Sequence, residues 1–113
     1  MNILLDHCLN WRLKRLLPGH FVKATYEPGW DTIKNGRLLT LAESQFEVFI
    51  TVDKGIKYQQ NFVGRTIAVI TLRGYDNKIE THAPLMPKVL ASLLTVQPGQ
   101  VYLMEAEPST EPF

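Results

Sequence analysis

The sequence predicts an α/β protein: a three-layer α/β/α domain with a mostly parallel central sheet of about five strands. Short, continuously apolar runs recur along the chain, and such runs are typical of strands that are buried on both faces of a sheet. Segments whose apolar residues have helical spacing separate these runs. Because strands that alternate with helices build parallel sheets, the two observations together indicate this fold class.

The first half of the chain holds three predicted strands and two predicted helices. Asn10 is an acceptable N-cap for the first helix, and Pro18-Gly19 stops it. The run at 48–52 is the strongest strand signal in the chain. The expected elements are a strand at 3–5, a helix at 11–17, a strand at 20–25, a helix at 36–44 and a strand at 48–52.

The second half continues the alternation. Residues 54–61 are polar and predict either a short helix or an irregular loop. An apolar strand follows at 66–72. Pro84 then opens a helix over 84–93, because proline is tolerated in a first turn, and Pro98-Gly99 turns the chain into a last strand at 101–104.

Length and composition indicate one domain. The chain has 113 residues, of which 45% are apolar, and it contains a single cysteine, Cys8. One cysteine excludes an internal disulfide and a cysteine-rich zinc site. The net charge is only +1, which excludes a strongly basic, histone-like mode of nucleic-acid binding but not a local basic face.

The acidic residues are unevenly placed. Three of the 11 fall in residues 105–113, as Glu105, Glu107 and Glu111, which leaves eight acidic against 12 basic residues in the rest. We therefore expect a domain at 1–104 and a flexible acidic tail with prolines at 105–113. The apolar start of the chain is too short for a secretory signal, and no segment approaches the ~20 apolar residues of a membrane span. We expect a cytoplasmic protein with no membrane partner.

Two aspartates follow predicted strands and define the candidate site. Asp6 ends the run 3–5, and Asp53 ends the run 48–52. Ligands of parallel sheets bind outside the carboxyl ends of the strands, and two neighbouring carboxylates there suit a hard cation such as Mg²⁺ or Mn²⁺. Such an ion can activate water for phosphodiester hydrolysis. The alternative is that each aspartate only caps a turn or helix.

Several motifs in order resemble the small PIN-like proteins of the DUF5615 family, over residues 1–104. The motifs are Leu5-Asp6-His7-Cys8, Pro18-Gly19-His20, Gly29-Trp30, Lys34-Asn35-Gly36-Arg37, Thr51-Val52-Asp53, Tyr58-Gln59-Gln60-Asn61, Leu72-Arg73 and Pro98-Gly99. The resemblance implies a PIN-domain-like fold and a metal-dependent ribonuclease. It also implies the toxin half of a bacterial toxin–antitoxin pair, with RNA as substrate and a small DNA-binding antitoxin as partner.

The chain departs from the pattern of PIN nucleases that have three or four acidic residues at one metal site. The helix-start acid falls near Asn35, the second residue of the opening acidic pair is His7, and Gly55 stands where related proteins often have another aspartate. Asp6 and Asp53 match the remaining acids. Because charge sets much of the affinity for a hard cation, this set binds Mg²⁺ more weakly than four carboxylates would.

Other polar residues follow the same strand ends. His7 could ligate a metal or act as a general base, or it could bond to the backbone. Gln59, Gln60 and Asn61 could hydrogen-bond bases or phosphates, or satisfy a turn. Arg73 could pair with Asp53 or contact phosphate.

The remaining candidates are predicted to be structural. Free cysteine usually behaves as a small apolar residue, so we expect this role for Cys8. We expect the helix at 11–17 to bury its apolar residues, Trp11 included. Its basic side chains, Arg12, Lys14 and Arg15, are expected to form a solvated face, and the alternative is an RNA track.

Three functional hypotheses follow. The first is an endoribonuclease toxin in which Asp6 and Asp53 hold Mg²⁺ or Mn²⁺ and Asn35 completes the site. The second is a catalytically weak or inactive PIN-like module that binds RNA or a protein partner. The third is a homodimer formed through the apolar stripe of the helix after Pro84.

Overall fold

The computed structural model describes residues 1–6, 8–24, 35–52, 64–74 and 78–105 of the chain. Its five strands form one sheet in the order β2-β1-β3-β4-β5, and every neighbouring pair is parallel. The predicted fold class is therefore confirmed. The strands are β1 (Asn2–Leu5), β2 (Phe21–Ala24), β3 (Val48–Thr51), β4 (Ala68–Arg73) and β5 (Val101–Glu105).

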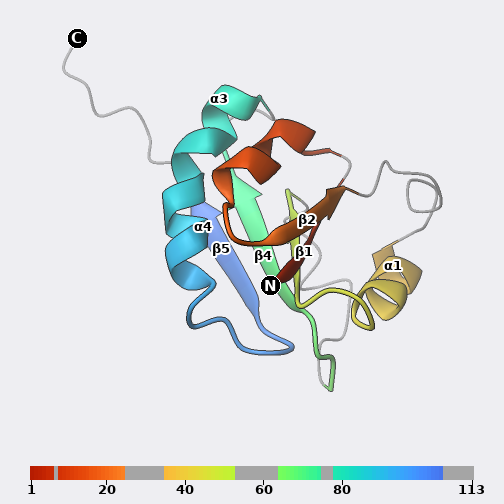
Figure 1. Cartoon of the computed structure of the whole chain (residues 1–113). Coiled ribbons are helices and arrows are strands. Elements are labelled where there is room, and N and C mark those ends of the chain that lie inside the picture. The colour runs from red at the N-terminus through yellow and green to blue at the C-terminus, as the bar shows by residue number, and fades with distance from the viewer. Residues whose placement is uncertain (7, 25–34, 53–63, 75–77, 106–113) are drawn as a thin grey trace, which may run out of the picture.

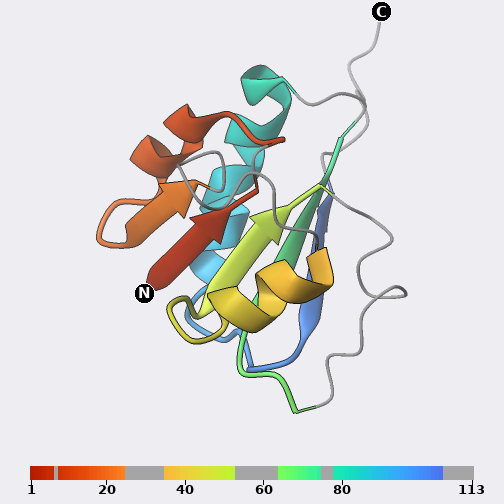
Figure 2. The same cartoon turned by 90° about the vertical axis from the view of Figure 1, so that its right-hand side faces the viewer.

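Helices cover both faces of the sheet, which gives three layers (Figures 1 and 2). One helix, α1 (Asn35–Ala42), lies on one face. The opposite face carries the 3₁₀ helix η1, drawn in orange, together with the consecutive helices α3, η2 and α4. These elements are η1 (Trp11–Leu16), α3 (Ile79–His82), η2 (Ala83–Leu85) and α4 (Met86–Ser92).

Each face of the sheet has its own apolar core. On the α1 side, Leu39 of the helix packs with Leu4 and Phe49 of the two central strands. The larger core lies on the other side, where residues of η1 and α4 pack with Ile3, Ile50 and other strand residues. All four residues of β3 are buried, which explains why its sequence is a continuous apolar run and not an alternating one.

The first helix is tighter than the α-helix that its sequence predicts. With three residues per turn instead of 3.6, the apolar positions no longer share one face. Leu13 and Leu17 are buried as expected, but Trp11 and Leu16 are each 38% exposed. The expectation that all four are buried is wrong for these two residues.

The last helical region begins earlier than predicted. The chain is helical from Ile79, five residues before Pro84, and it passes through a 3₁₀ turn at Ala83–Leu85 before α4. Proline has no N–H to bond to the carbonyl four residues before it, and a local 3₁₀ turn accommodates this loss. Leu85, Met86 and Val89 are buried in this chain's own core. The core of the chain thus covers the part of the apolar stripe formed by these three residues, through which the sequence predicts a homodimer.

Other predicted boundaries agree to within about two residues. The predicted helix 36–44 is α1, and the last strand extends one residue further than expected, to Glu105. Both predicted Pro-Gly turns contain a glycine with positive φ, 84° at Gly19 and 76° at Gly99, a conformation that glycine adopts without steric cost. The polar stretch 54–61 lies outside the described residues, as does the tail from residue 106.

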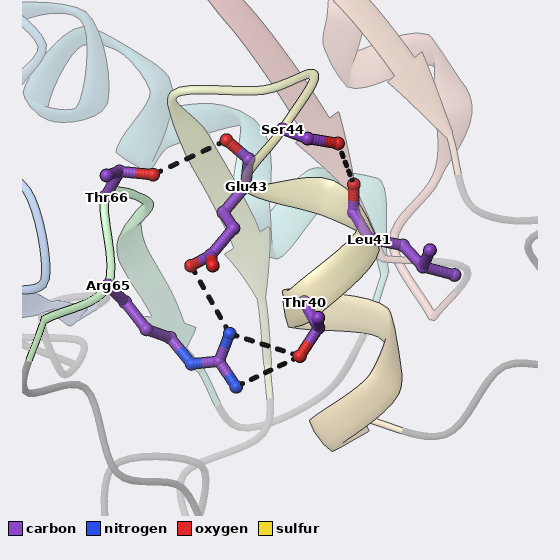
Figure 3. A network of polar contacts seen from close by, with 6 residues as sticks. All are labelled: Thr40, Leu41, Glu43, Ser44, Arg65 and Thr66. Atoms are coloured by element: carbon purple, nitrogen blue, oxygen red, sulfur yellow. Dashed lines mark hydrogen bonds and ion pairs between the residues drawn. The ribbon is translucent and has the colours of Figure 1, made fainter.

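A polar network ties the end of α1 to the start of β4 (Figure 3). Arg65 Nη1 lies 3.3 Å from Glu43 Oε2, and Nη2 donates to Thr40 Oγ1 at 3.3 Å. Thr66 Oγ1 donates to the Glu43 carbonyl at 3.4 Å. These contacts connect the carboxyl end of α1 to the segment that leads into β4, at the end remote from Asn35.

Candidate functional site

The strand order creates one switch point, between β1 and β3. The chain passes from β1 outward to β2, and then returns across β1 to β3 and onward in the other direction. Crossover connections therefore leave opposite sides of the sheet here, and ligands of open parallel sheets bind at such a point, beyond the carboxyl ends of the strands. Asp6 directly follows β1, so it lies at this point.

The backbone holds Asp6 in place on both sides. Its N–H donates to the Ile50 carbonyl at 2.9 Å, which continues the ladder between β1 and β3. Its own carbonyl accepts from the Leu9 N–H at 2.9 Å and closes a turn. The residue is only 7% exposed. A carboxylate in such a position needs polar partners, because burying an unpaired charge is costly.

Thr51 supplies one of these partners. Its Oγ1 donates to Asp6 Oδ2 at 2.6 Å, and both groups are buried. The contact follows from register: Leu5 pairs with Ile50, so the next residues on the two strands are adjacent. Thr51 in turn pairs with Thr71 of β4, which is also buried. Asp6, Thr51 and Thr71 thus form a polar row across β1, β3 and β4, near the carboxyl ends of these strands.

Cys8 supplies a second contact to the Asp6 carboxylate. Burial, the negative charge of Asp6 and a hydrogen bond to its carboxylate raise the pKa of the Cys8 thiol from 9.0 to about 11, although a hydrogen bond with the backbone of Val52 lowers it. A thiol that stays protonated at neutral pH is a poor nucleophile. This environment agrees with a structural role for Cys8.

The other predicted site residues fall into two groups. Asn35 is the first residue of α1, at the predicted start of the helix. Arg73 is the last residue of β4, and its Nη1 lies 3.2 Å from Glu105 Oε1 of β5, a pair whose side chains are both more than half exposed. The remaining predicted residues lie outside the described part of the chain: His7, Asp53, Gln59, Gln60 and Asn61.

The described residues provide a partial set of metal ligands. Among them, no group of three or more His, Cys, Asp or Glu side chains is arranged to hold a metal ion. Asp6 and Thr51 offer oxygen atoms, which suit Mg²⁺ or Mn²⁺, whereas a protonated thiol does not. Asp53 follows β3 by two residues, so the sequence places a second carboxylate after the strand that contacts Asp6.

Besides Asp6, four polar residues are buried among the described ones: Thr51, Thr71, Thr81 and His82. Thr51 lies within the apolar run 48–52, and a polar residue in such a run signals that a partner is required. His82 of α3 is completely buried, with 0% exposure. Its sequence context, Ile79-Glu80-Thr81-His82, lacks the apolar spacing that predicts a buried helix, so no signal marked it.

Comparisons with known proteins give no further assignment: no protein-family model, no curated protein and no solved structure matches the chain. No helix among the described residues is long and apolar enough to cross a membrane.

Proposed function

We propose that the protein is an Mg²⁺- or Mn²⁺-dependent endoribonuclease that acts as the toxin of a bacterial toxin–antitoxin pair. The observation that supports this proposal best is the position of Asp6. It is a buried carboxylate at the switch point of a parallel sheet, hydrogen-bonded to the strand that leads to Asp53. The resemblance of the sequence motifs to PIN-like proteins adds the reaction class.

In this proposal Asp6 and Asp53 hold the cation and Asn35 completes the site. The bound ion would supply Lewis-acid polarisation of the phosphodiester and a water of lowered pKa. The hydrogen bond from Thr51 to Asp6 Oδ2 would hold the carboxylate in one orientation. The other oxygen, Oδ1, would then be held in a fixed position for the cation. His7, Gln59, Gln60, Asn61 and Arg73 would contact the RNA or orient the metal ligands.

Cleavage of a labelled RNA in the presence of Mn²⁺ tests the reaction. We expect Asp53→Asn to abolish both cleavage and growth inhibition on expression, because it removes a negative ligand without changing the size of the side chain. Glu80→Gln, an exposed acid on α3, is the charge-matched control and should retain both. An Asp53→Asn variant that is as toxic as the parent would exclude metal-dependent cleavage as the mechanism.

The toxin assignment requires a partner. A small DNA-binding protein encoded by the neighbouring reading frame should bind this chain and suppress growth inhibition when the two are co-expressed. If no neighbouring protein relieves toxicity, the antitoxin part of the proposal is wrong even where cleavage is observed.

A second candidate is a catalytically weak or inactive module that binds RNA or a protein. The engagement of the Asp6 carboxylate by Thr51 and Cys8 favours it, since both contacts satisfy the carboxylate without a cation. Titration calorimetry with Mn²⁺ separates the two candidates. Binding at millimolar or lower Mn²⁺ that is lost in Asp6→Asn supports the nuclease, and the absence of binding supports the inactive module.

A further inference from the structure

An exposed tryptophan on η1 is surrounded by three cationic side chains. The guanidinium carbons of Arg12 and Arg15 lie 5.6 and 5.2 Å from the centroid of the Trp11 ring, and Lys14 Nζ lies 5.3 Å from it. We call these four residues the Trp11 cluster. Arg12, Lys14 and Arg15 are all exposed, and the tryptophan is 38% exposed. The cluster differs from a basic face that is only solvated, because all three cations lie within cation–π distance of the same aromatic ring.

The fold fixes the orientation of this cluster. Asn10 accepts a hydrogen bond from the Arg12 N–H at 2.9 Å and caps η1. Leu13 and Leu17, 0% and 1% exposed, anchor the helix in the core. Of the six residues of η1, Leu13 is buried and the other five are exposed. The ring and the cations are therefore presented to solvent by a rigid element.

The charges of the cluster are not neutralised within the described part of the chain. No carboxylate there pairs with Arg12, Lys14 or Arg15, whereas the arginines at 65 and 73 each have an acidic partner. Three cations close to one ring repel each other, and attraction to the ring offsets only part of this repulsion. A ligand with several closely spaced negative charges would relieve it.

We propose that the Trp11 cluster binds single-stranded RNA: phosphates draw the cations from the tryptophan ring, and a base stacks on the face that they leave. Arginine and lysine are the common phosphate ligands, and base–aromatic stacking is sequence-tolerant. An acidic peptide would satisfy the cations but leaves the ring unused. A membrane surface is disfavoured because the apolar side of η1 is buried in the core and cannot insert.

The cluster is near the candidate site in the chain and in the fold. Trp11 begins η1 five residues after Asp6, and the intervening turn starts at the Asp6 carbonyl. The start of η1 therefore lies within a few residues of the carboxyl end of β1. The choice of RNA over single-stranded DNA rests on the proposed function, whereas binding of a single strand rests on the cluster alone.

Fluorescence anisotropy with a labelled single-stranded 12-mer RNA in EDTA measures binding without cleavage. A triple variant, Arg12→Gln/Lys14→Gln/Arg15→Gln, should lower the slope of log K against log salt by about 2, since each lost phosphate contact in a single strand contributes about 0.7. Trp11→Leu should weaken binding by roughly 5- to 150-fold, the range for loss of one stacked base.

The single variants Arg15→Gln and Arg37→Gln form a matched pair. Both remove one exposed arginine, but Arg37 belongs to α1 on the opposite face of the sheet. Arg15→Gln should lower the salt slope by about 0.7, and Arg37→Gln should leave it unchanged. Equal effects of the two would overturn the proposal, because net charge and not the cluster would then determine binding.

Competitors distinguish the classes of partner. Unlabelled single-stranded DNA should compete strongly, whereas polyglutamate of equal charge and anionic phosphatidylserine vesicles should compete more weakly, because they leave the ring unused. Competition by either of the latter as strong as that of the DNA, or unchanged binding by Trp11→Leu, would overturn the assignment of a single-stranded nucleic acid. Because binding is measured in EDTA, where no metal-dependent cleavage occurs, loss of binding in the cluster variants and loss of cleavage in Asp53→Asn report on separate proposals.

Discussion

The hydroxyl of Thr51 on β3 donates a 2.6 Å hydrogen bond to the buried carboxylate of Asp6 at the end of β1. This bond joins the two strands that flank the switch point of the sheet. It orients the carboxylate and at the same time compensates for its burial. The same contact therefore serves the stability of the sheet and the geometry of the candidate site.

Removal of the Thr51 hydroxyl should destabilise the protein. Thr51→Val keeps the shape of the side chain but leaves Asp6 Oδ2 without this donor. We expect the free energy of unfolding to fall by about 1.5–3 kcal/mol, the range for hydrogen bonds to charged groups. Urea denaturation at pH 7 measures it. Thr71→Val, at the paired and buried position one strand further from Asp6, should cost less, and equal losses would contradict the prediction.

The raised pKa of Cys8 predicts a decline in stability at alkaline pH. The thiol titrates at 9.0 in the unfolded chain and at about 11 in the folded one, so the folded state binds the proton more tightly. The stabilisation is complete below pH 9 and is lost as the pH rises to about 11. Other groups titrate in this range too. The measurement is therefore the difference in unfolding free energy between the parent and Cys8→Ala, followed from pH 8 to 11.

Alkylation gives an independent check on Cys8. The rate of reaction of the folded protein with iodoacetamide should rise with pH up to about 11, because the thiolate is the reactive form. Asp6→Asn removes the negative charge and weakens the hydrogen bond that raise this pKa. The midpoint should then move to lower pH. A midpoint that does not respond to Asp6→Asn would show that burial alone holds the thiol protonated.

Two arginine–glutamate pairs of similar geometry should differ in strength. Arg65–Glu43 and Arg73–Glu105 have separations of 3.3 and 3.2 Å, but the side chains of the first pair are 19% and 28% exposed and those of the second 54% and 55%. Water and ions screen the second pair more. Double-mutant cycles should give a coupling of about 0.5–1 kcal/mol for the first and about 0–0.3 kcal/mol for the second. The reverse order would contradict this explanation.

Two leucines of η1 test the difference between the predicted and the observed helix. Leu13 is 0% exposed and Leu16 is 38% exposed. Leu13→Ala should lower the free energy of unfolding by about 2–5 kcal/mol, and Leu16→Ala by about 0.5 kcal/mol or less. Similar losses would indicate an α-helix that buries both residues, as the sequence alone predicts.

Local sequence patterns were sufficient for much of the fold. Continuous apolar runs located the strands, and Pro-Gly pairs located two turns, because burial and backbone freedom depend on residue type. The position of Asp6 at a strand end was predictable for the same reason. Its contact with Thr51 was not, since it depends on β1 and β3 being neighbours, and periodicity carries no information on strand order.

The helices were less predictable because their signals are weaker. In η1 an α-helical spacing of leucines is overridden by 3₁₀ winding, and Leu16 becomes exposed. In α3 the sequence Ile79-Glu80-Thr81-His82 has no apolar stripe, so a fully buried histidine could not be anticipated. Tertiary packing determined both outcomes, and a single sequence does not encode it in a local pattern.

The central place of β1 also affects how the chain can fold. Strand β1 lies between β2 and β3, and the second of these neighbours is not complete until residues 48–51 have been synthesised. Until then one edge of an apolar strand has no partner, and assembly depends on contacts between residues about 45 positions apart. Such long-range pairing slows folding and prolongs exposure of aggregation-prone edges. We therefore expect aggregation of this chain to be most favoured before β3 is available to pair with β1.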